Sequence, residues 1–558
     1  MNWLDLDLLI ETVKVVSIQC SAIEQPNTLK WINEKLAVTR NLPVYVWNYG
    51  QEVFQIYSAE PIQKIWDKFE PANECLIDVV NFLLHCQEPG IFVIENLHFF
   101  INVSPQADSL SRENALKIND KLRTIFNNWR LSQSPKYLIL LSTMGVDLPS
   151  HLINLIPEVW KPLPNQKQIL LIANEVLEEF NVDINTIDLN SLTLAASGLT
   201  EEEIKTGLRL GLKRCSTKEE DALFFLMQYK INLLRSLNLE FIPKPEINSF
   251  GGLDLLKKAF IEVKNKYSPE ARASNLPFPK GCLLVGPPGT GKSRALKACA
   301  VLLSFPLVML DVGTIVAGGL KFLKEMLLRV EALEPCVIGF DEFDKLFAAS
   351  NHSGEDIANR QILGTLLTWL QEKKSKTFVI ATLNRLKSLP PELTRAGRFD
   401  RKFYVGLPQA IERKEIIQLH ASRYDSRYAQ KDGPLTESEW RTLLNNSTVN
   451  FSGGELEAVV ERAVNKIFQR ALAEKRQKKL ARIADEDNVI SLEISGSDLI
   501  EAAQTIHSLY SIDPDRIMAI QNQSKYFCEP SSSPDSSKYA PPIQTFWGQP
   551  ISVSKNLD

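Results

Sequence analysis

Two phrases of the sequence repeat each other across the chain, EPGIFVIENLHFF at 88–100 and EPCVIGFDEFDKLF at 334–347. Each has Glu-Pro, then an apolar stretch, then a polar pair. Three later pairs follow in the same order: LPSHL with LPPEL, PLP with GLP, and GLTEEEIKTGL with FSGGELEAVV. The four offsets are 246, 241, 244 and 252 residues. A near-constant offset predicts one domain-sized unit written twice; the alternative is an unrelated N-terminal α/β domain with chance similarities.

The last pair of phrases also predicts a shared local structure. Thr200 with Glu203, and Ser452 with Glu455, each fit the S/T-x-x-E capping box that begins a helix. A single capping box is common, but two at equivalent places after their strand phrases support the duplication.

Alternating patterns within each repeat predict an α/β fold. In the second repeat, apolar runs at 305–313, 336–341 and 377–384 alternate with helical patterns at 322–333 and 362–372. This alternation is typical of a parallel sheet flanked by helices. After about 410, helical patterns dominate, which predicts a C-terminal helical lid.

A chain of 558 residues is too long for one core, so several domains are expected. The tail is rich in Ser and Pro, which favours disorder. The expected divisions are a degenerate α/β unit at 1–165, its helical lid at 166–240, a complete α/β core at 241–410, a second lid at 411–512 and a disordered tail at 513–558.

Composition excludes several classes of protein. The net charge of −4 argues against a polycation that coats nucleic acid. The 8 Cys include no C-x-x-C, which argues against a disulfide framework or zinc site and for a reducing compartment. Cys282, Cys299 and Cys336 lie in apolar runs and are expected in the core. No secretion signal and no apolar stretch of about 18 residues is present, so we expect a soluble protein without a membrane span.

The strongest motif is GPPGTGKS, which fits the phosphate loop G-x-x-x-x-G-K-[ST] and lies between an apolar strand and a helix. Glycines let backbone N–H groups approach phosphate oxygens, and the helix adds its positive end. Lys292 is expected to reach the β- and γ-phosphates, and the Ser293 hydroxyl to bind Mg²⁺. The predicted ATP-binding residues are Gly286, Pro287, Pro288, Gly289, Thr290, Gly291, Lys292 and Ser293.

An acidic pair ends the strand phrase at 336–341. In phosphate-loop enzymes an aspartate here holds the Mg²⁺ shell, which assigns Asp341 as a metal residue. The adjacent Glu342 can orient and deprotonate the attacking water. Such a pair is usually a solvated turn, but a phosphate loop upstream favours catalysis.

With these motifs, residues 250–510 resemble the AAA family of ATPases. FGGLDLLKKAF at 250–260 looks like that family's opening motif, which implies a nucleotide contact at Gly251. VIATLNR looks like its sensor-1 strand, with Asn384 sensing the γ-phosphate. LTRAGRFDRKF looks like its second region of homology, which implies that Arg395 and Arg398 reach the neighbouring subunit's nucleotide.

The lid carries further resemblance. IIQLH and FSGGEL look like the family's lid helices, which implies that His420 lies near the ribose and Gly453 and Gly454 near the adenine. The order of a degenerate unit before a complete one resembles the hypothetical-chloroplast-reading-frame AAA ATPases of cyanobacteria and algal plastids. One departure concerns the pore loop: VGTIVAGGLKFLKEML at 312–327 has no aromatic residue before Phe322, which puts substrate threading in doubt.

The first repeat lacks the catalytic residues. It has no G-K-[ST], and Asn96, which cannot accept a proton, stands where the second repeat has Glu342. LPSHLINLIPEVWKPLP contains no arginine. A unit that has the apolar pattern of the fold but lacks the catalytic residues is typical of a domain retained for packing or for contact with a partner.

The sequence therefore predicts a Mg²⁺-dependent ATPase that remodels or assembles a protein partner, with a link to photosynthesis if the narrower resemblance holds. The resemblance implies a homo-oligomer, most simply a hexamer, located in the cytoplasm or plastid stroma. The first alternative is a slow ATP-binding switch or scaffold. The second is a nucleic-acid motor, favoured only by the basic run EKRQKKLAR at 474–482 and opposed by the acidic balance.

Overall fold

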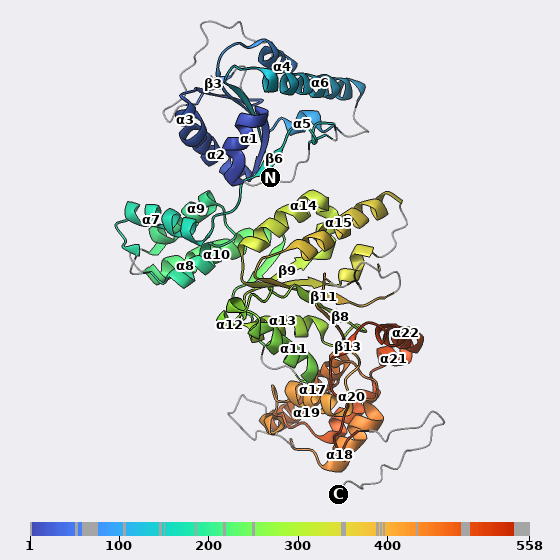
Figure 1. The fold of residues 1–558 in the computed structure, drawn as a ribbon. Helices are drawn as coiled ribbons and strands as arrows, with labels where there is room; N and C mark the ends of the chain where they lie inside the picture. The colour runs from blue at the N-terminus through green and yellow to red at the C-terminus, as the bar shows by residue number, and fades with distance from the viewer. Residues whose placement is uncertain are drawn as a thin grey trace. The chain divides into compact units, whose positions relative to one another are not determined.

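A computed structural model describes residues 3–540 and divides them into two compact units (Figure 1). Unit 1 contains the chain up to Ser236 together with Gly318–Leu333, and unit 2 contains Leu237–Ala317 and the chain from Glu334 onward. The positions not described within this range are 51–53, 58–75, 104–107, 144–147, 150, 185–186, 216–218, 248–250, 348–352, 387–389, 391–392, 394, 396, 431–432 and 481–491.

Unit 2 is built on a seven-stranded sheet with the order β13-β12-β8-β11-β10-β9-β7. All neighbouring strands are parallel except β7, which is antiparallel to β9. The strands are β7 (Leu239–Ile242), β8 (Gly281–Val285), β9 (Leu307–Asp311), β10 (Cys336–Asp341), β11 (Thr377–Leu383), β12 (Arg401–Tyr404) and β13 (Glu529–Pro530). The three apolar runs predicted as strands are confirmed as β9, β10 and β11.

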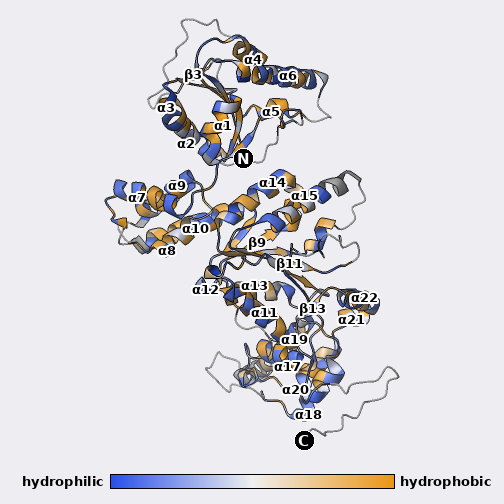
Figure 2. Cartoon of the chain, viewed as in Figure 1, coloured by the Kyte–Doolittle hydropathy of each residue, from blue (hydrophilic) through white to orange (hydrophobic). Residues whose placement is uncertain are grey.

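The sheet of unit 2 is buried on both faces, as expected for parallel strands (Figures 1 and 2). On one face, α13 (Lys292–Leu303) packs through Leu296 and Cys299 against the strands. On the other, α15 (Ser353–Glu372) lies beside Phe340 and Val379. Cys282, Cys299 and Cys336 are all buried, which confirms the prediction from their apolar surroundings.

The other helices of unit 2 flank the sheet or form the lid. Those of the α/β part are α11 (Asp254–Asn265), α12 (Pro269–Ala273) and α14 (Val312–Ala332), the last broken at Gly319 and shared with unit 1. The lid contains α17 (Ala410–Ala421), α18 (Glu437–Thr442), α19 (Gly453–Leu480) and α20 (Gly496–Gln504), followed by α21 (Leu509–Ile512) and α22 (Pro514–Ser524). The lid has its own core, which includes Trp440, Leu456 and Leu499.

Unit 1 repeats this topology. Its sheet has the order β3-β2-β4-β5-β1-β6, so β6-β1-β5-β4-β2 matches β12-β8-β11-β10-β9 strand for strand. The strands are β1 (Val15–Cys20), β2 (Val44–Trp47), β3 (Gln55–Ile56), β4 (Gly90–Glu95), β5 (Lys136–Thr143) and β6 (Glu158–Trp160). The duplication predicted from the repeated phrases is confirmed at the level of the fold.

The helices of unit 1 also fall into two groups. Those beside its sheet are α1 (Leu6–Val13), α2 (Gln25–Trp31), α3 (Val38–Arg40), α4 (Leu76–His85), α5 (His98–Ile101) and α6 (Ser109–Leu131). The lid-like group is α7 (Gln166–Glu179), α8 (Leu189–Ala196), α9 (Glu201–Cys215) and α10 (Glu219–Ser236), with a separate core that includes Ile169, Leu192 and Leu208.

Both predicted capping boxes are present. The Thr200 N–H donates to Glu203 Oε2 at 2.7 Å and the Glu203 N–H to Thr200 Oγ1 at 3.3 Å. In unit 2 the Ser452 N–H donates to Glu455 Oε2 at 2.6 Å and the Glu455 N–H to Ser452 Oγ at 3.4 Å. The two repeats therefore begin equivalent lid helices, α9 and α19, in the same way.

The structure corrects the expected disordered tail over its described part. Residues 514–524 form α22, residues 529–530 form β13, and Tyr539 is buried in the lid core. Composition alone missed this order because the segment is held by contacts with residues far away in sequence. Of the basic run at 474–482, the backbone to 480 continues α19, while the side chains lie outside the described residues.

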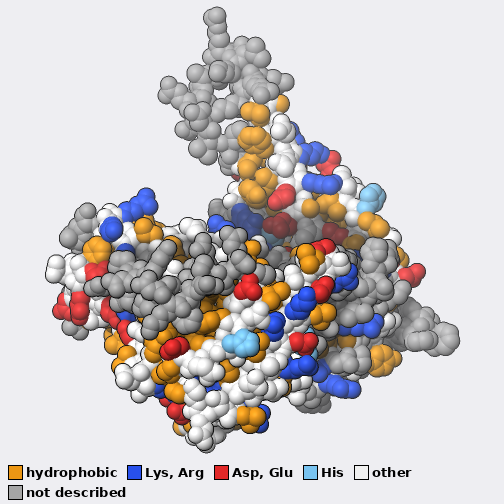
Figure 3. All heavy atoms as spheres, turned by 90° about the horizontal axis from the view of Figure 1, so that it is seen from above, with side chains coloured by type: hydrophobic (Ala, Val, Ile, Leu, Met, Phe, Trp, Pro, Cys, Tyr) orange, Lys and Arg blue, Asp and Glu red, His pale blue; other side chains and the backbone are white. Residues whose placement is uncertain are grey.

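Two further observations concern the surface. Among the described residues, none of the helices combines the length and apolar character needed to cross a membrane. On the face seen in Figure 3, side chains of Lys and Arg are interspersed with those of Asp and Glu. A mixed surface of this kind does not concentrate one sign of charge on that face.

Candidate active site

A cavity of about 540 Å³ opens in unit 2 where the carboxyl ends of the parallel strands meet the lid. It is lined by the loop after β8, the ends of β10 and β11, the helices α17 and the start of α19, and residues 530–532. This volume is in the range of pockets that hold small molecules and cofactors. The strand ends of a parallel sheet are the usual place for such ligands.

The loop of residues 286–291 has the backbone of a phosphate cradle. Gly289 and Gly291 have positive φ of 76° and 91°, which glycine adopts at little cost. A Cβ at Gly286 would lie 1.9 Å from the carbonyl oxygen of Val405, so only glycine fits there. The Thr290 hydroxyl closes the loop by donating to the Pro287 carbonyl at 2.9 Å.

Lys292 begins α13 and is almost fully buried under this loop. Its ammonium donates to the carbonyl oxygens of Gly286 at 2.9 Å and Pro287 at 2.6 Å. Burial lowers the pKa of Lys292 from 10.5 to about 8, against the opposing effect of nearby carboxylates, Asp341 first. An anionic ligand in the loop would restore the charged form.

Asp341 is held by two hydroxyl groups from different elements. Ser293 Oγ, in the first turn of α13, donates to Asp341 Oδ2 at 2.8 Å. Thr382 Oγ1, on the neighbouring strand β11, donates to Asp341 Oδ1 at 2.5 Å. The predicted metal residues Ser293 and Asp341 are thus adjacent, with oxygen donors of the kind that Mg²⁺ prefers.

Glu342 follows in a left-handed conformation, with φ of 52°. Its N–H donates to Thr382 Oγ1 at 3.0 Å, which fixes the turn. The side chain is half exposed and forms an ion pair with Lys345 at 2.6 Å. Asn384 lies at the end of β11, with its N–H donating to Asp344 Oδ1 at 3.1 Å. Both Glu342 and Asn384 line the cavity, as predicted.

The remaining predicted residues also lie in the wall of the cavity. Gly251 and Gly453 line it, and the Gly454 N–H donates to the carbonyl oxygen of Gly289 at 3.1 Å, which joins the lid helix α19 to the loop. His420 is buried, with Nδ1 3.0 Å from Glu457 Oε1. Burial lowers the pKa of His420, opposed by Glu457, so the neutral ring is favoured.

Arg395 and Arg398 are not part of this cavity's described lining. Arg395 is exposed and Arg398 is partly exposed, in the segment before β12. The role predicted for them stays a prediction.

Sequence reasoning missed three contributors to the site. Thr382 holds Asp341 and Glu342, and Asp344 holds Asn384, but these contacts depend on the pairing of β10 with β11. A polar residue inside the apolar run TFVIATLN was the available signal for Thr382. The third contributor is Pro530–Ser532, in the segment predicted to be disordered.

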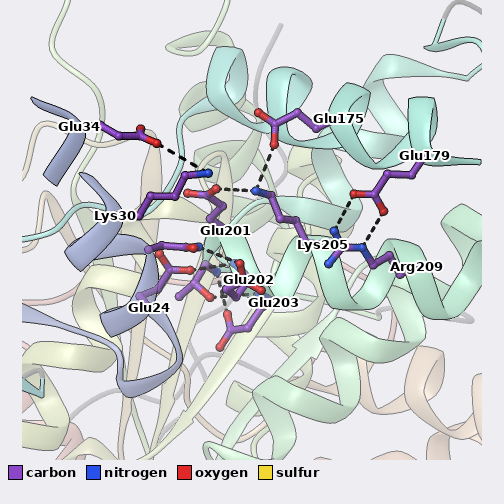
Figure 4. A network of polar contacts seen from close by, with 12 residues as sticks. Glu24, Lys30, Glu34, Glu175, Glu179, Glu201, Glu202, Glu203, Lys205 and Arg209 are labelled. Carbon is purple, nitrogen blue, oxygen red and sulfur yellow. Dashed lines mark hydrogen bonds and ion pairs between the residues drawn. The ribbon is translucent and has the colours of Figure 1, made fainter. Parts of the chain in front are cut away.

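The equivalent edge of unit 1 is occupied by its own side chains. Residues 21–24 replace the longer loop 286–291, and α2 follows at once. Glu24 is buried and forms an ion pair with Lys161 at 2.7 Å. It also accepts the Glu202 N–H at 2.8 Å, at the start of α9 (Figure 4). A carboxylate of the chain itself therefore neutralises the positive groups at this edge.

The residues after β4 complete this polar cluster. Asn96 Oδ1 accepts a hydrogen bond from Gln25 Nε2 at 3.0 Å, and Glu95 Oε2 accepts one from Asn48 Nδ2 at 2.9 Å. None of these contacts involves a residue equivalent to Lys292 or Ser293 of unit 2. The edge is bonded internally, in agreement with a unit that has lost the chemistry.

The geometry of unit 2 fits a nucleoside triphosphate with Mg²⁺. The glycine loop and the first turn of α13 present N–H groups, Lys292 supplies positive charge, and Ser293 with Asp341 supplies oxygen ligands. The lining also includes Leu253, Ile416 and Leu419, whose apolar side chains are suited to contact a base.

The comparisons with known proteins agree with this geometry. The profile of the ATPase family associated with various cellular activities (AAA) matches residues 282–407. The AAA domain-containing protein ycf46 of Guillardia theta is 31% identical over 389 residues, 68% of this chain and 72% of that protein. Its namesake in Pyropia yezoensis is 31% identical over 382 residues, 67% and 76%.

A more distant relative is the 26S proteasome regulatory subunit 6A of Encephalitozoon cuniculi, 26% identical over 361 residues, 62% of this chain and 85% of that protein. The repeated sheet topology, the phosphate loop and the extent of these matches lead to one conclusion. This chain belongs to the AAA family of ATPases, with ycf46 AAA domain-containing proteins among its relatives.

Proposed function

We propose that this chain is a Mg²⁺-dependent ATPase with its one catalytic pocket in unit 2. The observation that carries the proposal is the hydrogen-bonded series Ser293–Asp341–Thr382, which brings the helix after the phosphate loop, the acidic pair and the sensor strand together. An acidic pair on an ordinary surface turn would not be held from both sides.

Each residue has one task in this proposal. The loop and Lys292 bind the phosphates, and Ser293 with Asp341 would hold Mg²⁺, which when bound neutralises charge on the phosphate oxygens. Glu342 orients water and accepts its proton. Thr382 fixes the turn that carries Asp341 and Glu342, and Asn384 senses the γ-phosphate.

We further propose that the active form is a homo-oligomer, most simply a hexamer, in which Arg395 and Arg398 act on the neighbouring subunit's nucleotide. The exposure of Arg395 supports this, as does the subunit named among the relatives. Arginines supplied in this way are worth about 10³–10⁵ in rate in other phosphate-loop enzymes. Mixing Glu342→Gln chains with Arg398→Ala chains should restore some turnover; no recovery at any ratio would contradict the arrangement.

The work driven by ATP is proposed to be the remodelling or assembly of a protein partner. The algal relatives support a plastid or cyanobacterial setting linked to photosynthesis. Helix α14 follows β9 directly, and residues 312–321 contain no aromatic residue. Threading of a substrate past an aromatic pore loop is therefore not part of the proposal.

The lack of an aromatic residue at 312–321 also favours one alternative, an ATP-binding switch that turns over slowly and acts as a scaffold. The steady-state rate of phosphate release distinguishes the two: an ATPase should turn over in the usual enzyme range of about 1–10³ s⁻¹, whereas a switch should turn over far more slowly.

The test of the catalytic assignment is Glu342→Gln. This variant should bind ATP as tightly as the wild type and lose turnover, because the amide cannot accept the proton. Glu372→Gln, at an exposed glutamate ending α15, is the matched control and should keep full turnover. Unchanged turnover in Glu342→Gln would contradict the assignment. The ATP-bound variant is also the form with which to capture the protein partner.

A further inference from the structure

Residues 528–540, here called the strap, cross from the α/β core of unit 2 to its lid. The strap begins as β13, which pairs with β12 through Phe403 with Glu529 and Tyr404 with Pro530. It thereby covers the edge strand of the sheet. Arg401 secures it further by bonding both carboxylate oxygens of Glu529 at 3.0 and 2.5 Å.

The strap then bonds to the start of α11. The carbonyl oxygen of Ser531 accepts the Leu256 N–H at 3.1 Å. The N–H and Oγ of Ser533 donate to the two carboxylate oxygens of Asp254 at 2.8 and 2.6 Å. These bonds lower the pKa of Asp254, the side-chain hydroxyl contributing most, so the contact is made with the ionised carboxylate.

From there the strap reaches the lid. Ser532 Oγ donates to Glu412 Oε1 at 2.6 Å, and Asp535 Oδ2 accepts the Ile411 N–H at 3.1 Å, both at the first turn of α17. Tyr539 is 4% exposed and lies in the lid core, with the Lys414 ammonium 5.3 Å from its ring centroid. One segment is thus fixed to both bodies that enclose the cavity.

The strap also forms part of the cavity wall. Pro530, Ser531 and Ser532 line it, and Ser531 is 4% exposed. Glu412 Oε1, which accepts from Ser532, also accepts the Leu253 N–H at 2.9 Å. The strap therefore lies beside Leu253, one of the apolar residues of the cavity wall.

We propose that the strap is the base-side wall of the nucleotide site and the clasp that holds the lid against the core, so that it sets the affinity for the nucleoside part of the ligand. The inference rests on the proposed function of the same cavity. Binding energy gained at this wall depends on the strap, whereas binding of the phosphates by the loop around Lys292 does not.

The test compares two probes, ADP and inorganic tripolyphosphate, by calorimetric titration. A chain ending at Phe527 lacks the strap, and a chain ending at Ala540 is its matched control. The shorter chain should bind ADP at least about tenfold more weakly than the control and tripolyphosphate equally well. Equal ADP affinity in the two chains would overturn the inference.

A second variant serves if the shorter chain does not fold. Ser532→Ala with Ser533→Ala removes the hydroxyl bonds to Glu412 and Asp254 without emptying the lid core. It should weaken ADP binding by about fivefold, the effect of roughly 1 kcal/mol of lost hydrogen bonding, and leave tripolyphosphate binding unchanged. Tyr526→Ala, at a side chain 91% exposed just before the strap, is the control.

The outcomes separate the two proposals. If the double variant and the shorter chain both bind ADP as tightly as the full chain does, the strap does not contribute to nucleotide affinity. The proposed ATP site is then unaffected, and only this inference is overturned. If tripolyphosphate binding falls together with ADP binding, the strap acts through the phosphate loop and its base-side role is overturned. If the full chain binds neither probe, the proposed function and this inference both fail.

Discussion

Asn96 and Glu342 occupy the same backbone conformation at the same place in the two units. Each follows directly after its strand, β4 or β10, with φ of 57° and 52° respectively. Asparagine adopts this left-handed conformation readily, whereas glutamate does so at a cost of about 1–2 kcal/mol. The unit without a phosphate loop carries the residue that suits the turn, and the unit with the loop carries the proposed base.

Glu342→Asn should therefore stabilise the protein while abolishing its turnover. Relief of backbone strain should raise the free energy of unfolding of unit 2 by up to about 1 kcal/mol. Denaturant unfolding measures the first effect and phosphate release the second. Glu342→Gln keeps the strained turn and should not be stabilised. Equal stability of the two variants would contradict the role of the turn.

Thr382 is proposed to position Asp341 and Glu342 without touching the nucleotide. Thr382→Val keeps the shape of the side chain but leaves Asp341 Oδ1 and the Glu342 N–H without this buried partner. Loss of such a supporting contact typically lowers activity about 10–100-fold. The turnover number should fall while the Kd for ADP stays unchanged, and Thr382→Ser should recover most of the loss. A failure of serine to restore turnover would argue for packing as the role of this residue.

Because the pKa of Lys292 is lowered, we predict that the protein takes up protons when nucleotide binds. Its pKa of about 8 means that roughly half of the side chains are neutral at pH 8, and bound phosphates favour the charged form. Titration with ADP at pH 8 in two buffers of different ionisation enthalpy should show net uptake of up to about half a proton, falling towards zero below pH 7 as Lys292 is already charged. Lys292→Arg, which stays charged, should show no uptake; uptake unchanged in that variant would assign the proton elsewhere.

The same shift has a consequence for stability without nucleotide. The folded pKa of Lys292 lies below the unfolded value of 10.5, so the unfolded chain binds more protons between about pH 8 and 10.5. The penalty for burying the charge is full below pH 8 and is relieved as pH rises through this window. Lys292→Met buries no charge at this position. The stability of this variant relative to the wild type should therefore be highest below pH 8 and should decline as pH rises through this window.

Glu24 is predicted to be the structural anchor of unit 1. Glu24→Gln leaves Lys161 without its buried counter-ion and should lower the free energy of unfolding by about 2–3 kcal/mol, discounted because Lys161 is 17% exposed. Glu34→Gln is the control, since the Lys30–Glu34 pair is exposed on both sides and is worth less than about 0.5 kcal/mol. The Kd for ADP should not change in either variant. Equal effects on stability would mean that Glu24 is not an anchor.

The sequence predicts those parts of the site that depend on local order. The phosphate loop, Asp341 and Glu342 are found because glycines, a lysine and a carboxylate pair have fixed positions relative to a strand. The duplication is found because apolar skeletons persist when catalytic residues are lost. Both capping boxes are found because their partners are three residues apart.

The missed parts depend on contacts between distant segments. Thr382 meets Asp341 only because β10 and β11 pair. The Ser and Pro content of the strap predicts disorder. In the structure, however, Ser533 donates a hydrogen bond to Asp254, 279 residues away. Glu24 belongs to no sequence motif, because it occupies the edge of the unit 1 sheet at which unit 2 has its phosphate loop.

The central claim is that nucleotide binds only in unit 2, and the stoichiometry of binding tests it most directly. Calorimetric titration of the whole chain with ADP should give one site per chain, and Lys292→Ala should abolish it. Two sites per chain, or one site that persists in Lys292→Ala, would place nucleotide outside the cavity of unit 2 and contradict the account.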